Sequence, residues 1–273
     1  MKYSNIMREI KTVRDYKKDA IGEDKLGEIL NFGKSIEGLQ GAGKLDFLLV
    51  TDGKKMFENL SGKAGYHGKL IEAPHYLILT GSSEQLDKRN AGYTMELVRF
   101  KAWEMGIGTC WLSIEKEAEL KEALKIEGDS TPLAMISIGY QYKGIFKQDI
   151  QQKSFRQAAA EIVYMGTWGT TPEFEELEAR GVGNIFYNTR LAPSWGNIQP
   201  WKFLINKDEA ILTMKKESDK DYLIDSGIVM MYFEKACVSD GIDTKWETNI
   251  DVDSIRAERN IPNDYEIVGI CRK

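Results

Sequence analysis

The residues best suited to chemistry lie in one loop at positions 192–203, with the sequence Ala-Pro-Ser-Trp-Gly-Asn-Ile-Gln-Pro-Trp-Lys-Phe. Its Ser194, Asn197 and Gln199 offer hydroxyl and amide groups, which bind a ligand through hydrogen bonds. A degenerate copy precedes the loop by 156 positions, because residues 29–50 align without a gap on residues 185–206. In the copy, Glu37, Gly38, Gly41 and Gly43 stand opposite Pro193, Ser194, Asn197 and Gln199. One fold therefore occurs twice in this chain, and its polar loop is kept once.

A second pair of segments supports this internal duplication, at an offset of 135 positions. Residues 92–111 end in Gly-Ile-Gly-Thr-Cys-Trp, and residues 227–246 end in Gly-Ile-Asp-Thr-Lys-Trp. Both segments predict a helix that is apolar on one side and ends at Gly106 or Gly241, in the left-handed conformation that glycine adopts most easily. The offset is far longer than the roughly 20 to 50 residues of solenoid repeats, which favours a duplication over a repeat array.

The elements that must position these residues follow the same order in both halves. In the first half we predict helices at 5–12, 24–34 and near 54–60, a helix from 92, a short helix at 115–124, and strands at 45–51, 75–80 and 132–141. In the second half we predict helices at 172–190 and from 227, and strands at 201–206, 209–214, 244–247 and 264–271. A mostly antiparallel sheet with separate helices makes the class α+β. Residues 143–154, rich in Gln and Lys without an apolar period, are the expected connector.

Composition excludes several classes of function. A net charge of −5 with scattered basic residues gives no reason to expect a nucleic-acid partner. The charged N-terminus, and the absence of a long apolar run, speak against secretion and membrane insertion. Three cysteines without a CxxC pair suit the reducing cytoplasm. The only histidines are His67 and His75, which speaks against a zinc site built from histidines and against a Ser-His-Asp triad.

Cationic segments accompany the polar loop at three places in the first half and its connector. Residues 10–14 read Ile-Lys-Thr-Val-Arg and are followed by Tyr16; residues 68–74 read Gly-Lys-Leu-Ile-Glu-Ala-Pro; residues 153–158 read Lys-Ser-Phe-Arg-Gln-Ala. With the loop at 192–203, these segments make each half resemble a subunit of the nitroreductase family of FMN-dependent oxidoreductases. The whole chain resembles the putative TM nitroreductase group, in which one chain holds two such halves. The resemblance covers nearly the whole sequence, and the loop is its most specific part.

The resemblance implies a set of FMN-binding residues and no catalytic side chain or metal ligand. The implied cofactor-binding residues are Lys11, Thr12, Arg14, Lys69, Ser113, Ile114, Lys153, Arg156, Pro193, Ser194, Asn197 and Gln199. In the family, Lys69 would lie near flavin N1, the backbone after Trp111 would face N5, and Lys153 with Arg156 would close on the phosphate. Ile10 stands where the family has an arginine, so the affinity for FMN is expected to be low unless Arg8 substitutes.

The two halves complement each other in what they lack. In place of the segment that holds Lys11 and Arg14, the second half has Gly-Thr-Trp-Gly-Thr-Thr-Pro at 166–172. Family subunits form homodimers with two interface sites, so we expect a monomeric internal pseudo-dimer here, with one composite FMN site. Its expected halves are residues 1–155, with the phosphate and pyrimidine contacts, and residues 156–273, with the polar loop.

The expected function is an FMN-dependent oxidoreductase that passes hydride from NADH or NADPH to a small nitroaromatic, quinone or similar acceptor. Two alternatives stay open: a sensor or scaffold protein that binds flavin or none, and a flavin enzyme that is reduced by a protein donor. Taken singly, the residues also have structural interpretations. Arg14 and Lys69 would be surface charges, and Pro193-Ser194 would be a helix stop followed by a turn.

Overall fold

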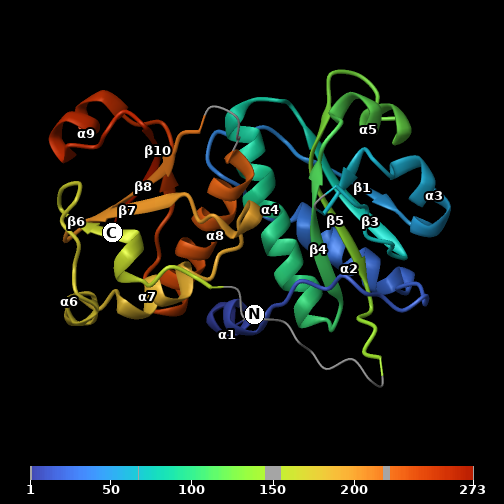
Figure 1. Cartoon of the computed structure of the whole chain (residues 1–273), viewed down its shortest axis with the longest axis horizontal. Helices are drawn as coiled ribbons and strands as arrows, with labels where there is room; N and C mark the ends of the chain where they lie inside the picture. The colour runs from blue at the N-terminus through green and yellow to red at the C-terminus, as the bar shows by residue number, and fades with distance from the viewer. Residues whose placement is uncertain (1, 67, 145–154, 218–221, 273) are drawn as a thin grey trace. The chain divides into compact units, whose positions relative to one another are not determined.

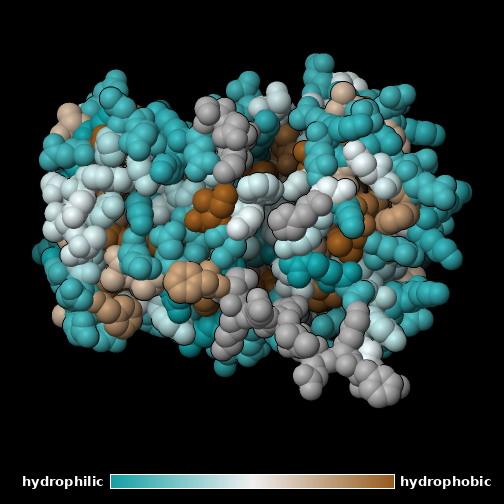
Figure 2. Space-filling model, viewed as in Figure 1, coloured by the Kyte–Doolittle hydropathy of each residue, from teal (hydrophilic) through white to brown (hydrophobic). Residues whose placement is uncertain are grey.

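The computed structural model describes residues 2–66, 68–144, 155–217 and 222–272 (Figure 1). These residues form two compact units. The first unit holds residues 9–38 and the described residues from 42 to 144; the second holds residues 2–8, residues 39–41 and the described residues from 155 onward. The connector expected at 143–154 lies almost entirely outside the described residues. Hydrophilic residues cover most of the face drawn in Figure 2, as expected for a chain that is 29% charged.

The first unit is built on a five-stranded antiparallel sheet with the spatial order β1-β3-β5-β4-β2. Its strands are β1 (Asp46–Val50), β2 (Ala64–Gly65), β3 (His75–Gly81), β4 (Gly108–Ile114) and β5 (Thr131–Gly139). The helices are α2 (Glu23–Lys34), α3 (Gly53–Leu60), α4 (Gln85–Glu104) and α5 (Glu117–Ala123). Strand β3, which lies between β1 and β5, is buried along its whole length, which explains its unbroken apolar run Tyr-Leu-Ile-Leu.

The second unit has a mixed five-stranded sheet with the order β6-β7-β8-β10-β9. Its strands are β6 (Val163–Met165), β7 (Trp201–Ile205), β8 (Glu209–Lys215), β9 (Trp246–Glu247) and β10 (Tyr265–Arg272). The helices are α6 (Phe174–Ala179), α7 (Gly183–Thr189), α8 (Leu223–Ser239) and α9 (Val252–Arg259), and most of α1 (Tyr3–Glu9) belongs to this unit as well. Only β6 runs parallel to its neighbour; the other pairs are antiparallel.

The two sheets repeat one topology. Strands β1, β3, β5 and β4 follow one another in the same spatial order, and with the same antiparallel pairing, as β7, β8, β10 and β9. A long helix follows the second strand of each set, α4 in the first unit and α8 in the second, and a short helix, α5 or α9, precedes the last strand in sequence. The α+β fold is thus duplicated within one chain, as the sequence repeats predict.

The glycine anchors of the repeat behave as predicted. Gly106 and Gly241 follow the ends of α4 and α8 with φ of 73° and 78°, a left-handed conformation that strains residues with a side chain. In each case the next residue, Ile107 or Ile242, donates its N–H back into the last turn of the helix at 2.9 Å. These bonds satisfy carbonyl groups that the helix end would otherwise leave unpaired.

Several boundaries differ from the prediction. The helix predicted at 172–190 is wrong, because Gly181 with φ of 72° separates α6 from α7. The helix predicted at 5–12 ends at Glu9, and the residues after it are extended. Both long helices begin earlier than predicted, at Gln85 and Leu223. The strand predicted at 244–247 is shorter, and β2, β4, β6 and α9 were not predicted at all.

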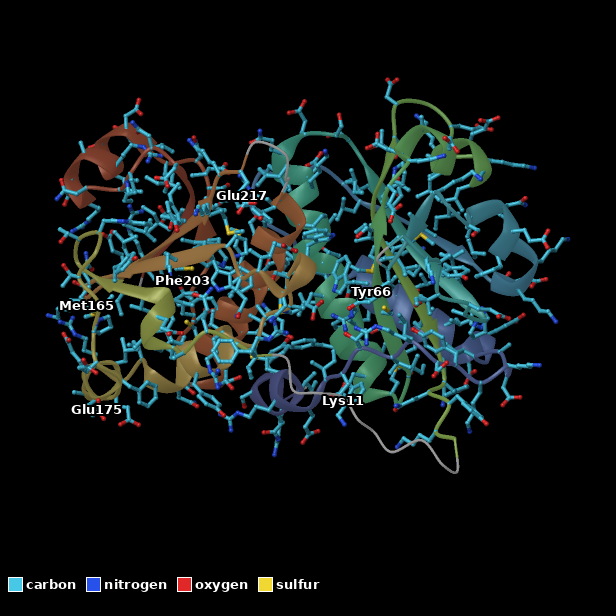
Figure 3. The ribbon with its side chains drawn as sticks, in the orientation of Figure 1. Lys11, Tyr66, Met165, Glu175, Phe203 and Glu217 are labelled. Atoms are coloured by element: carbon cyan, nitrogen blue, oxygen red, sulfur yellow. The ribbon has the colours of Figure 1, made fainter. Side chains whose placement is uncertain are left out.

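Aromatic side chains form a cluster between the second sheet and the helices α7 and α8. Phe203 of β7 lies 5.3 Å from Phe186 and 5.1 Å from Phe233 between ring centroids, and Phe233 lies 5.5 Å from Trp246. Figure 3 labels Phe203 within this unit. The opposite face carries a separate cluster around Leu204, which is consistent with the alternation of side chains along a strand. The region after Ile205 on the Phe203 face leads to the pocket described below.

Candidate functional site

The segment from Lys11 to Tyr16 is held along the edge of the first sheet. Thr12 forms a parallel bridge with Thr109 of β4, and Val13 donates its N–H to the Thr109 carbonyl at 2.9 Å. Gly108 allows this close approach, because a Cβ there would lie 2.6 Å from a methyl group of Val13. The backbone contacts fix the direction of the segment and leave the side chains of Lys11 and Arg14 exposed.

A buried ion pair lies next to this segment. Arg99 donates to both carboxylate oxygens of Glu96 at 2.9 and 2.7 Å, and the two side chains are 3% and 0% exposed. The same guanidinium donates through Nε to Thr109 Oγ1 at 3.0 Å, and Trp111 donates its indole N–H to Glu96 at 2.7 Å. The network therefore fixes Thr109 and Trp111 of β4, the part of the strand that pairs with Thr12. The sequence analysis did not predict this network.

Tyr66 joins two of the cations that the sequence singles out. Arg14 donates to the Tyr66 phenol oxygen at 2.7 Å, and its guanidinium carbon lies 4.3 Å from the Tyr66 ring centroid. Tyr66 and Lys69 exchange backbone hydrogen bonds of 2.8 and 3.2 Å in a tight turn. The side chain of Lys69 is exposed. Tyr66 was not predicted as a site residue, although an aromatic residue three positions before a candidate lysine is a signal that could have found it (Figure 3).

The turn with Tyr66 is attached to the end of β4. Gly65 of β2 pairs with Ser113, and Ala64 pairs with Ile114. Gly65 also approaches the Lys69 backbone so closely that a Cβ would lie 2.8 Å from the Lys69 carbonyl carbon. Direct contacts thus link the predicted residues of the first unit through β4 and its neighbours, from Thr12 on Thr109 to Lys69 on the β2 turn. We call this set the β4-edge cluster, consisting of Lys11, Thr12, Arg14, Tyr66, Lys69, Ser113 and Ile114.

The polar loop of the second unit is tightly built. Ser194 accepts the Gln199 N–H through its hydroxyl at 2.9 Å, and the Trp195 N–H donates to the Asp225 carboxylate at 3.0 Å. Asn197 and Gln199 have φ of 58° and 54°, in the left-handed region that costs most residues free energy. The Ser194 hydroxyl within the loop and the Asp225 carboxylate of α8 therefore hold the loop in a fixed shape, and Pro193 at its start is half-buried.

The amide side chains of this loop bind other parts of the second unit. Gln199 is 3% exposed, accepts the Gln157 N–H at 2.9 Å and donates to the Arg190 carbonyl at 2.9 Å. Asn197 accepts from Arg156 and donates to the Phe155 carbonyl at 2.7 Å. The structure thus brings Arg156 together with Asn197, two residues that the sequence places 41 positions apart. Lys153 lies outside the described residues.

The degenerate copy of the loop is held differently. Gly43, opposite Gln199 in the repeat, donates its N–H to the Asp87 carboxylate at 2.6 Å, and Ser82 donates to the same carboxylate. Gly41, opposite Asn197, has φ of 85°, so both copies place a left-handed residue at this position. Arg8, the expected substitute for the missing arginine at Ile10, donates to Asn188 and Asn184 at 3.0 and 2.9 Å within the second unit.

His75 gives a prediction for the stability of the first unit. It is 2% exposed, it accepts the Ile21 N–H through Nε2 at 2.9 Å, and burial lowers its pKa from the usual value of about 6.5. Below that pH the unfolded chain binds a proton that the folded chain excludes, so the free energy of unfolding should fall as the pH drops from 7 to 5. Urea unfolding of wild type and His75→Gln across this range measures the effect. Equal slopes for both proteins would show that His75 does not contribute.

The described residues contain no helix whose length and hydropathy suit a membrane span. Within the same residues there is no group of three or more His, Cys, Asp or Glu side chains that could hold a metal ion.

Comparisons with known proteins identify relatives of this arrangement. A family model described as putative TM nitroreductase matches residues 3–237. Among solved structures, a putative nitroreductase from Thermotoga maritima MSB8 matches 100% of this chain and 94% of its own, with a TM-score of 0.64 and 17% sequence identity. The likeness over both full chains shows a shared fold that includes both units. The duplicated α+β fold is therefore similar to that of the nitroreductases.

Shorter chains match about half of this one. An FMN-dependent nitroreductase from Clostridium difficile R20291 matches 56% of this chain and 98% of its own, with a TM-score of 0.44 and 23% identity. The structure of B. megaterium NfrA2 matches 59% of this chain and 73% of its own, with a TM-score of 0.48 and 17% identity. No curated protein matches the chain.

Proposed function

The chain belongs to the putative TM nitroreductase family, and on that premise we propose that it is an FMN-dependent oxidoreductase. NADH or NADPH would be the electron donor, and a nitroaromatic, quinone or similar small molecule the acceptor. The observation that carries the proposal is the β4-edge cluster. There, Arg14 donates to the Tyr66 hydroxyl and the Lys69 backbone pairs with that of Tyr66, in a turn attached to the strand that ends in Ser113 and Ile114.

The donor set of this cluster suits FMN. A phosphate prefers guanidinium and ammonium donors, and Arg14 and Lys11 are exposed cations on one short segment. A flavin ring gains negative charge on its pyrimidine side when it is reduced, and a fixed cation such as Lys69 stabilises that charge. When bound, FMN supplies the hydride chemistry, so the protein needs no nucleophile of its own. The residues of the chain would bind and orient the cofactor, and the substrate proton would come from water.

Lys69 supplies a direct test of this proposal. Removing its charge should make bound FMN harder to reduce, so Lys69→Ala should lower the midpoint potential by tens of millivolts, where about 30 mV corresponds to 1.4 kcal/mol for two electrons. Spectroelectrochemical titration of the reconstituted protein measures this shift. Lys63→Ala is the matched control, because that lysine lies on the same turn region and donates to the Asn59 carbonyl instead. Equal midpoint potentials for the two variants would show that Lys69 does not lie near the flavin.

We also propose that FMN binding needs residues from both sequence halves, at one FMN per chain. The support comes from the sequence: the segment with Arg14 occurs in the first half alone, and the loop with Asn197 keeps its polar residues in the second half alone. The loop's fixed shape and its contact with Arg156 are consistent with a preformed contribution to an anionic ligand.

One observation favours a second candidate, a binding protein without catalytic turnover. The amide groups of Asn197 and Gln199 already bind Phe155, Arg156, Gln157 and Arg190, and Ile10 replaces a family arginine. Absorption spectra separate the candidates. A yellow protein that NADH or NADPH bleaches is the oxidoreductase. Bleaching by dithionite alone indicates either an enzyme with a protein donor or a non-enzyme that binds flavin. A colourless protein that FMN cannot reconstitute is a non-enzyme that binds no flavin.

A further inference from the structure

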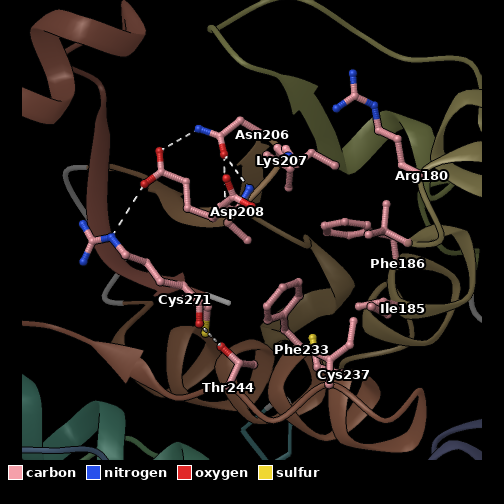
Figure 4. A pocket seen from close by; sticks show the side chains of 16 residues that line it. Arg180, Ile185, Phe186, Asn206, Lys207, Asp208, Phe233, Cys237, Thr244 and Cys271 are labelled. Atoms are coloured by element: carbon pink, nitrogen blue, oxygen red, sulfur yellow. Dashed lines mark hydrogen bonds and ion pairs between the residues drawn. The ribbon is translucent and has the colours of Figure 1, made fainter.

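The second unit contains a pocket that the proposed flavin chemistry does not use (Figure 4). It has a volume of about 300 Å³ and lies where β7 ends and β8 begins, against α7 and α8. Phe186 and Phe233 point into it, and the thiols of Cys237 and Cys271 line it. Lys207 and Asp208, both exposed, form part of its rim. An apolar pocket with a few polar groups at its mouth is the usual form of a small-molecule site.

The pocket is separate from the polar loop. The loop enters β7 at Trp201, and the pocket begins at Ile205, the other end of the same strand. At about 3.3 Å per residue, the length of β7 puts roughly 13 Å between these ends. A ligand in the pocket would therefore not contact Asn197 or Gln199.

The internal duplication allows the pocket to be compared with the corresponding position of the first unit, which a segment of the chain covers. Thr244 lines the pocket, and its counterpart at an offset of 135 positions is Thr109. Thr109 pairs with Thr12 and accepts the Val13 N–H, so a segment of the chain itself covers that position. In the second unit the segment before α6 packs elsewhere, with Trp168 4.8 Å from Tyr164 and 4.4 Å from Tyr265 in the cluster on the other sheet face.

Two charged residues that line the pocket, Glu209 and Arg272, are compensated within the protein. Glu209 accepts from Arg259 at 2.6 Å and from Asn206 at 2.9 Å, and Arg272 pairs with Glu247. A charged ligand would have to compete with these ion pairs. Burial raises the pKa of both thiols, to about 12 for Cys237, and so keeps them uncharged. The inner wall of the pocket, which these thiols share with Phe186 and Phe233, therefore carries no charge. A neutral ligand is therefore favoured over an ionic one.

The walls and the volume define the ligand further. Aromatic rings pair well with phenylalanine rings in edge-to-face or offset geometry, and sulfur makes favourable contacts with ring edges. A cavity of about 150 Å³ holds one benzene, so a pocket of about 300 Å³ has room for two fused rings. We propose that this pocket binds a neutral bicyclic aromatic molecule, at a site distinct from the residues proposed for FMN.

The test uses the full-length protein and 2-naphthol as the probe. Isothermal titration calorimetry should show one binding event for wild type, and Ala210→Leu should weaken it at least tenfold by filling the pocket from β8. Ala257→Leu, on the exposed side of α9 in the same unit, is the matched control and should bind like wild type. No binding by wild type, or equal binding by Ala210→Leu and the control, would overturn the proposal.

Thiol labelling tests the same site without relying on a variant that fills the core. N-ethylmaleimide modification is mapped by mass spectrometry, and 2-naphthol at ten times its Kd should slow labelling of Cys237 and Cys271 about tenfold. Cys110, buried in the first unit, is the internal control and should show no protection. Protection of all three thiols, or of none, contradicts the site. Saturating FMN should leave naphthol binding unchanged, so failure of the flavin proposal and failure of this one are distinguishable.

Discussion

Replacing Arg99 with methionine should lower the free energy of unfolding by about 3 to 5 kcal/mol, the usual cost of leaving a buried charge without its partner. Glu96 is 0% exposed, and both of its carboxylate oxygens accept hydrogen bonds from Arg99 in the interior of the first unit. The Arg99→Met variant would leave that carboxylate with the Trp111 indole among its remaining donors. Equilibrium urea unfolding followed by circular dichroism measures the loss.

The control for this prediction is an ion pair with the same spacing at the surface. Lys116 and Glu119 are also three residues apart, but their side chains are 55% and 53% exposed, and such pairs contribute about 0 to 1 kcal/mol. Lys116→Met should therefore have a small effect. If Arg99→Met costs no more than this control, the buried pair does not hold the first unit together. Adding Glu96→Gln to Arg99→Met should recover part of the loss, because a neutral amide can still accept from Trp111.

Arg14→Ala should weaken FMN binding by roughly 10- to 150-fold, because a hydrogen bond to a charged group contributes about 1.5 to 3 kcal/mol. The FMN affinity of Arg14→Lys should lie between those of wild type and Arg14→Ala, since a lysine keeps the charge and loses the planar guanidinium group. Lys17→Ala is the matched control, an exposed cation three residues further along. Fluorescence quenching of FMN, titrated with apo-protein, gives the Kd values. An effect of Lys17→Ala equal to that of Arg14→Ala would show only a general charge effect.

The same titration tests the contribution of the second half. Asn197→Ala and Arg156→Ala should each weaken FMN binding, and wild type should bind one FMN per chain as a monomer of 31.0 kDa. Gly41→Asn, which restores a polar residue to the degenerate copy of the loop, should not create a second site. Light scattering gives the mass. Two FMN per chain, or an obligate dimer, would defeat the proposal of one site that uses both halves.

Periodicity and glycine positions predicted the repeated part of the fold. Gly106 and Gly241 marked helix ends correctly because a left-handed residue after an apolar helix leaves a strong local signal. The start of α4 was missed, because residues 85–90 read Gln-Leu-Asp-Lys-Arg-Asn, a polar stretch that tertiary contacts bury at Asp87, Arg89 and Asn90. The helix α9 did carry a signal, since Asp251 accepts the Ser254 N–H as an N-cap, and this signal was overlooked.

Short sequence motifs predict the charged residues of the candidate site but not the residues that support them. Arg14 and Lys69 were predicted from such motifs. Tyr66 was not, because its contact with Arg14 joins positions 52 apart and depends on how β2 meets β4. Glu96 and Arg99 have the spacing of an ordinary exposed pair on a helix, and the sequence does not show that this pair is buried.

The contact between Arg8 and Asn188 spans 180 positions of the chain. At about 5 to 20 residues per second, a ribosome would make Asn188 roughly 10 to 40 s after Arg8. Residues 2–8 would wait through the synthesis of the whole first sheet before their partners in the second unit existed. Closing so long a loop also carries an entropic cost that grows slowly with its length. The oldest part of the nascent chain is thus among the last to reach its place, and the order of synthesis is not the order of assembly.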